Sequence, residues 1–229
     1  GQGVASGNTV YPAGTAVSAG VRVMKDVPTF ALDNSLGSTG LASGKLMRFS
    51  VTADSHGNGV GIANFALKIA SSTGVSVTNL TIYAYQNSNY TNPVGGVQGS
   101  GDVESVDQCA SNNCTSGQVI PITVTNAAGT PTPLEISPGQ TVYFEVDASL
   151  SGVVSGSSVT TTLVGSSSFP STAATATQNP LKTAGSLPNT ELIWSPNTNG
   201  ISALTDQDWT NGYGVPGLPS GGLIQTRSQ

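Results

Sequence analysis

The feature that most constrains this chain is the alternation of apolar and polar side chains between residues 45 and 85. Met47, Phe49 and Val51 alternate with polar residues, the period of two expected of a strand with one face in a core and one in water. Two short polar breaks divide this stretch into three runs, 45–53, 60–70 and 75–85. Three strands joined by short turns predict an antiparallel meander.

The second and third runs each change phase once. Val60 and Ile62 share one phase and Phe65 and Leu67 the other, so the slip falls near Asn64. The third run slips in the same way, and the residues involved are Val75 and Val77 before Asn79 and Leu80, Ile82 and Ala84 after it. One extra residue in a strand is a β-bulge, so we expect bulges near Asn64 and Asn79.

Further strands follow from the same patterning. Residues 142–150 alternate most cleanly, and after a glycine-flanked turn residues 158–164 return with a similar pattern, which predicts a hairpin. The first strand, within 21–32, contains Pro28, and proline places this segment at a sheet edge or crossing between sheets. Shorter strands are predicted at 119–124, 134–136 and 191–194.

Together these patterns predict an all-β fold, an Ig-like antiparallel β-sandwich with long loops and extended N- and C-terminal arms. We expect an N-terminal arm at 1–20, the sandwich at 21–195, and a C-terminal segment at 196–229 that packs on the sandwich or on a neighbour.

Composition narrows the function classes. Charged residues are 8% of the chain, against about 25% in an ordinary soluble domain. The seven Lys and Arg residues are dispersed, which argues against nucleic-acid binding. No apolar run approaches the roughly 20 residues that would span a membrane.

Catalytic motifs are missing from the sequence. Acyl-transfer chemistry needs a nucleophile with a base, and His56, the single histidine, lies in a glycine-rich turn. Neither a Gly-x-Ser-x-Gly elbow nor a His-Glu-x-x-His helix occurs, and Gly44-Lys45 is followed by leucine instead of Ser or Thr. We therefore expect a protein that is not an enzyme.

No cofactor is expected, with Ca²⁺ as the one alternative. Asp54, His56 and Asn58 alternate ahead of Gly59, like the start of a calcium loop, but Phe65 stands where the bidentate acid of position 12 belongs. The competing interpretation is an ordinary Asx turn. A second calcium site could form from three acidic residues of the predicted long loop at 86–117, namely Asp102, Glu104 and Asp107.

The two cysteines, Cys109 and Cys114, are separated by four residues that include two Asn, so a local disulfide is feasible. A disulfide in a polar loop is typical of an oxidising compartment, which predicts an extracellular or cell-surface location. Three Asn residues match the glycosylation acceptor pattern, namely Asn79, Asn89 and Asn113.

The end of the chain carries a resemblance. Trp194-Ser-Pro, Asp208-Trp-Thr-Asn-Gly-Tyr213 and Val215-Pro-Gly-Leu-Pro219 resemble the C-terminal domain of uncharacterised secreted proteins of candidate-phylum bacteria (Patescibacteria), as do 25–30 and the strand at 49–54. The resemblance implies a surface-displayed, Ig-like sandwich. It offers no catalytic residues to carry over.

Two functions fit these observations. The first is a structural subunit of a self-assembling surface filament, sheath or surface layer, a homo-oligomer or polymer in which an arm such as 9–27 adds a strand to a neighbour's open sheet edge. The second is a cell-surface adhesion or carbohydrate-binding module. Its sugar-stacking rings would come from Tyr83, Tyr85, Tyr90, Trp209 and Tyr213.

Overall fold

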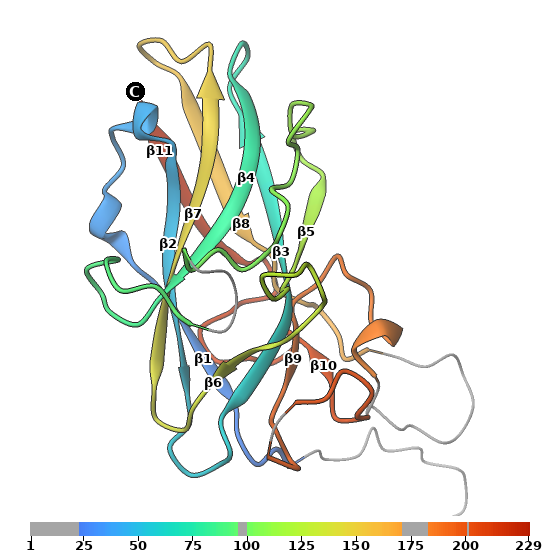
Figure 1. The fold of residues 1–229 in the computed structure, drawn as a ribbon. Helices are drawn as coiled ribbons and strands as arrows, with labels where there is room; N and C mark the ends of the chain where they lie inside the picture. The colour runs from blue at the N-terminus through green and yellow to red at the C-terminus, as the bar shows by residue number, and fades with distance from the viewer. Residues whose placement is uncertain (1–22, 96–99, 171–182, 201) are drawn as a thin grey trace, which may run out of the picture.

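The computed structural model describes residues 23–95, 100–170, 183–200 and 202–229. Two antiparallel sheets pack face to face, which confirms the all-β sandwich (Figure 1). The four-stranded sheet has the order β1 (Pro28–Leu32), β2 (Lys45–Ala53), β7 (Thr141–Ser151) and β4 (Ser76–Tyr85). Among the described residues the only helices are three-residue 3₁₀ turns, η1 (Asn34–Leu36), η2 (Leu41–Ser43) and η3 (Ala184–Ser186), and none could cross a membrane.

The seven-stranded sheet is built around one long strand, β3 (Val60–Ser71). The path through this sheet is β10 (Thr210–Asn211), β9 (Ile193–Ser195), β3, β8 (Ser158–Leu163) and β11 (Leu223–Ser228). Two further short strands, β5 (Val119–Thr123) and β6 (Leu134–Ile136), also pair with β3. Since β3 has 12 residues, it has room for four partners along its two edges.

The predicted meander is wrong. β2 and β4 lie in one sheet with β7 between them, whereas β3 lies in the other sheet. The predicted hairpin of β7 and β8 is wrong for the same reason, because these strands also belong to different sheets. Their connecting turns cross from one sheet to the other. Alternation identifies the buried face of a strand, and strands of both sheets bury their apolar faces in one core, so the pattern does not identify the neighbouring strand.

Both predicted bulges are confirmed. The pairing of β3 with β9 shifts between Ile62 and Asn64, and that of β4 with β7 shifts between Thr78 and Thr81. The bulge turns Ala63 to the outer face of the sheet, while Ile62 and Phe65 stay in the core between the sheets. The edge position of the first strand is also confirmed, since β1 ends the four-stranded sheet.

Aromatic rings fill the centre of the sandwich. Phe49 of β2 and Phe144 of β7 stack with ring centroids 4.9 Å apart. Phe65 of β3 meets both rings edge-on from the other sheet, with centroids 5.9 and 5.2 Å away. All three side chains are fully buried, and burial of each contributes about 1.5–3 kcal/mol.

The C-terminal part, 196–229, contributes strands to the sandwich itself. β10 pairs with β9, and β11 pairs with all six residues of β8. Trp194 is buried and its Nε1 donates a hydrogen bond to the carbonyl of Asn211 at 2.7 Å. The closing motif that carries the resemblance therefore serves packing. The predicted N-terminal arm, 1–20, lies outside the described residues.

Candidate functional site

The outer face of the four-stranded sheet carries a cluster of charges around Glu145, whose side chain is only 2% exposed. Arg48 donates from Nε to the Glu145 carboxylate at 2.6 Å and approaches it with Nη2 at 2.5 Å. Lys45 binds the other oxygen of Glu145 and reaches Asp147 at 3.4 Å. These residues come from adjacent strands, β2 and β7, so the sheet register itself places them together.

Tyr90 covers this cluster from the loop after β4. The guanidinium carbon of Arg48 lies 3.9 Å from the centroid of the Tyr90 ring, which is a cation–π contact. The Tyr90 hydroxyl donates to Asp33 at 2.5 Å, and burial together with this hydrogen bond raises the pKa of Tyr90. Tyr85 and Tyr143 pack edge-on against Tyr90. Tyr90 is therefore a packing residue, whereas sugar stacking by the half-buried Tyr85 stays a prediction.

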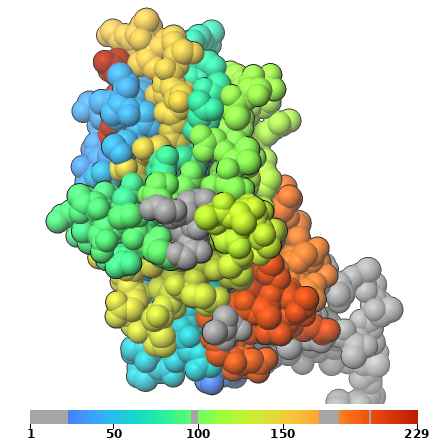
Figure 2. Space-filling model, viewed as in Figure 1, coloured from blue at the N-terminus to red at the C-terminus, as the bar shows by residue number. Residues whose placement is uncertain are grey.

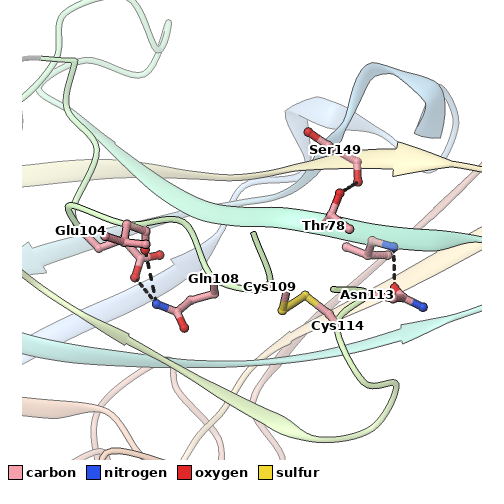
Figure 3. Close-up of a disulfide and its surroundings, with 9 residues drawn as sticks. Thr78, Glu104, Gln108, Cys109, Asn113, Cys114 and Ser149 are labelled. Carbon is pink, nitrogen blue, oxygen red and sulfur yellow. Dashed lines mark hydrogen bonds between the residues drawn. A yellow bond between two sulfur atoms is a disulfide. The ribbon is translucent and has the colours of Figure 1, made fainter. Parts of the chain in front are cut away.

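The predicted disulfide between Cys109 and Cys114 is confirmed, and it lies on the edge of β4 (Figure 3). Cys114 N donates to the carbonyl of Val77 at 2.8 Å, and the Asn113 side chain accepts from Val77 N at 2.7 Å. Gln108 exchanges two backbone hydrogen bonds with Leu80. The loop thus satisfies the backbone groups that an edge strand would otherwise leave open.

Glu104 is a buried acid in the loop that contains the disulfide, and Figure 3 shows its side chain beside Gln108. Gln108 Nε2 donates to one of its oxygens at 2.7 Å, whereas Oε1 has no hydrogen-bond partner among the described residues. Burial raises the pKa of Glu104 to about 8, and burial likewise raises the pKa of the neighbouring Asp102. A carboxyl that is protonated near neutral pH is a poor calcium ligand.

The structure does not favour either calcium site predicted from the sequence. Asp54 Oδ1 accepts from His56 N at 2.8 Å and contacts His56 Nδ1 at 2.7 Å, which is an Asx turn. Asn58 turns away and donates its amide to the carbonyl of Asn197. Within the described ranges, no three His, Cys, Asp or Glu side chains gather as a metal site would require.

The sugar-stacking role predicted for Trp209 is wrong, because its side chain has no exposed surface. It centres a small apolar cluster on the outer face of the seven-stranded sheet, and its Nε1 donates to the carbonyl of Ala203. The other members of this cluster, which we call the outer apolar cluster, are Ala63, Ala184, Leu187, Ile193 and Leu204. A groove of about 550 Å³ runs beside it, between η3 and the strands β3 and β5.

The remaining predicted residues differ in accessibility. Tyr83 is half-buried on the four-stranded sheet, whereas Tyr213 is 39% exposed. Of the glycosylation candidates, Asn89 lies exposed in the loop after β4. Asn79 occupies the β4 bulge, where its amide donates to Ser149. Glycosylation stays a prediction for all three Asn residues, of which Asn89 and Asn113 are exposed.

No known protein family and no curated protein matches this chain.

Proposed function

We propose that this protein is a structural subunit of an extracellular assembly, such as a surface filament, sheath or surface layer, whose copies join end to end. The observation that carries the proposal is an exposed valine at each of two opposite poles of the sandwich, Val23 beside the 54–59 turn and Val154 in the turn between β7 and β8. Asp26 accepts hydrogen bonds from Gly59 N and Val27 N, so the chain enters the sandwich beside the 54–59 turn. Gln229 pairs with Gly156 and Ser157 at the opposite pole (Figure 1).

Three strand edges of the sandwich, those of β4, β1 and β11, contact other segments of the same chain. The edge of β4 is covered by the disulfide loop, and Phe30 N of β1 donates to the carbonyl of Pro216. On β11, Ser228 N donates to the carbonyl of Ser38. Because these edges are occupied by the chain's own segments, we favour contacts between poles over the strand addition that the sequence suggested.

Each pole presents an exposed valine. Val23 is 89% exposed next to the entry point, and Val154 is 66% exposed in the turn between β7 and β8. Figure 2 shows this turn at the top of the molecule and the 54–59 turn at the bottom. Burying an exposed valine between copies would contribute about 1.5–3 kcal/mol, so one apolar contact at each pole would help repeated association.

The extracellular location is part of the proposal. A disulfide that covers a sheet edge is useful only where thiols stay oxidised. The resemblance of the closing motif to secreted surface proteins points to the same compartment. Polarity supplied by Ser, Thr, Asn and Gly leaves few charges to repel one copy from the next.

The test is the oligomeric state of the full chain. We expect sedimentation velocity and electron microscopy to show linear oligomers that lengthen with concentration. Val154→Lys should reduce assembly strongly, because a lysine cannot be buried unpaired at the pole. Val106→Lys is the matched control, since Val106 is also 66% exposed but lies in the loop beside β4. A chain that stays monomeric at all concentrations would contradict the proposal.

A further inference from the structure

Two aromatic rings project together from the surface near β10. Phe169 and Tyr213 are 43% and 39% exposed, and they are the only aromatic side chains among the large exposed hydrophobic residues of the described chain. Their ring centroids lie 4.6 Å apart, with an angle of 52° between the planes. Most other rings of the chain are buried or half-buried, so this exposed pair needs an explanation.

Asn211, which is 2% exposed, fixes both segments that carry these rings. Its side-chain nitrogen donates to the carbonyl of Ser168 at 2.9 Å and to Glu191 at 2.7 Å. Its side-chain oxygen accepts from Tyr213 N at 3.1 Å. A single buried amide thus connects the residue before Phe169 to Tyr213 itself, and the pair is held in place before any ligand arrives.

Beside Tyr213 lies a shallow depression of about 480 Å³, bounded by Ser166, Gly214, Val215 and the turn 217–220. Its floor is anchored in the sandwich, because Val215 and Leu218 belong to the core. Gly217 has φ of +74°, and a Cβ there would lie 1.7 Å from the carbonyl oxygen of Phe30. The backbone at Gly217 therefore packs directly on β1, which makes the depression a fixed shape.

The chemistry of the depression is neutral and rich in hydroxyl groups. Ser166 is 4% exposed, and its Oγ has no hydrogen-bond partner among the described residues. Because this Oγ is enclosed, it does not meet a ligand directly in this structure. Ser220 adds a second hydroxyl at the rim, and no described residue of the lining carries a charge. A phosphate or carboxylate would find no counter-charge here.

We propose that Phe169, Tyr213 and this depression bind a neutral glycan. A pyranose ring has an apolar face that stacks on an aromatic ring, and its rim carries hydroxyls that both donate and accept hydrogen bonds. The exposed ring pair offers the stacking surface, and the exposed Ser220 offers a hydroxyl partner. The inference does not depend on end-to-end assembly, because neither Val23 nor Val154 belongs to the ring pair or to the lining of the depression.

The experiment uses the full chain against an array of neutral oligosaccharides of glucose, mannose, galactose and N-acetylglucosamine, with uronic-acid oligomers beside them. Titration calorimetry then measures the affinity for the best neutral oligomer. We expect Tyr213→Ala and Phe169→Ala to weaken binding about tenfold or more. Ser220→Ala should weaken it about fivefold. Ile224→Ala removes another exposed apolar side chain, which is 55% exposed on β11, and should leave binding unchanged.

Several outcomes would overturn the proposal: no neutral oligomer binds at millimolar concentration, only the acidic oligomers bind, or the two ring variants bind as well as the original protein. Loss of self-association in Tyr213→Ala without any glycan binding would instead identify the ring pair as an interface between copies. If an alanine variant fails to fold, NMR of the unmodified protein decides, because the ring protons of Phe169 and Tyr213 must shift on titration with the oligomer.

Discussion

The outer faces of the two sheets are covered by opposite kinds of chemistry. On the four-stranded sheet, Arg48 and Lys45 surround the buried carboxylate of Glu145, and Tyr90 covers the guanidinium. On the seven-stranded sheet, the outer apolar cluster closes around Trp209. One face is held by charge pairs and hydrogen bonds, and the other by burial of apolar area.

The two coverings also differ in where their residues come from. The charged cluster is built on two neighbouring strands, and its partners Arg48 and Glu145 lie opposite each other in the register of β2 and β7. The apolar cluster brings β3 together with segments more than a hundred residues later in the chain. The polar residues that alternate along two neighbouring strands can thus form a polar covering by themselves. The apolar covering, in contrast, requires a separate segment that folds over the sheet.

The largest effect is expected from Trp209→Ala, which removes the centre of the apolar covering. Deleting a fully buried tryptophan should lower the free energy of unfolding by about 3–5 kcal/mol. Chemical denaturation measures this change, and Tyr213→Ala, at an exposed ring, is the control. A loss below about 1 kcal/mol would mean that this covering adds little to the sandwich.

The second largest effect on stability is expected at Glu104, which lies in the disulfide loop that covers the edge of β4. Burial raises the pKa of Glu104 to about 8, above the value of 4.5 for an exposed glutamate. The folded state therefore holds a proton that the unfolded chain releases, so stability is full below about pH 4.5 and falls as the pH rises towards 8.

Glu104→Gln removes this proton linkage while keeping the shape of the side chain. We expect the variant to be more stable than the original protein at pH 8–9, on the order of a few kcal/mol, and similar to it near pH 4. Denaturation curves at both pH values measure the difference. Equal stability of the two proteins at high pH would show that Glu104 is ionised in the fold.

A smaller effect is expected from Glu145→Ala, which leaves the half-buried Arg48 without its carboxylate. The loss should be about 2–3 kcal/mol, because the guanidinium keeps its desolvation cost and loses its partner. Lys45→Ala should cost less than about 1 kcal/mol, since the Lys45 side chain is 37% exposed and screened by water. If Glu145→Ala and Lys45→Ala lower the free energy of unfolding by the same amount, burial does not make the ion pair of Arg48 with Glu145 more important for stability than that of Lys45.

Several local features of the fold could be predicted from the sequence because their causes are local. A phase slip near Asn64 or Asn79 is a bulge wherever the strand pairs, and Pro28 cannot donate to a ladder in any sheet. The cysteines are close enough along the chain to pair without help from the rest of the fold.

Strand β11 was missed because its pattern is inverted. Gln225 and Arg227 are buried, whereas Ile224 is 55% exposed. Gln225 accepts from Arg48 N at 3.1 Å, and Arg227 donates to the carbonyls of Leu36, Gly37 and Gly40. These partners are carbonyls of the loop before β2 and the backbone of β2 in the other sheet, and no sequence pattern predicts them.

The candidate site shows the same limit. The sequence predicted both Trp209 and Tyr213 as sugar-stacking rings. It did not single out Phe169, which lies in a stretch rich in Ser and Thr. Only the fold revealed that Trp209 is enclosed by the outer apolar cluster and that Asn211 holds the segments of Phe169 and Tyr213 together.

The amino-acid sequence by itself determined that this chain forms strands with apolar faces, where two of them bulge, which one lies at an edge and which cysteines pair. The tertiary structure decided which strands are neighbours, which aromatic rings stay exposed and how each outer face is covered. The physical reason is that alternation and bulges arise from the backbone geometry of a few adjacent residues. Strand order and burial, in contrast, depend on contacts between segments far apart in the chain, such as β3 with Trp209 and β11 with the loop before β2.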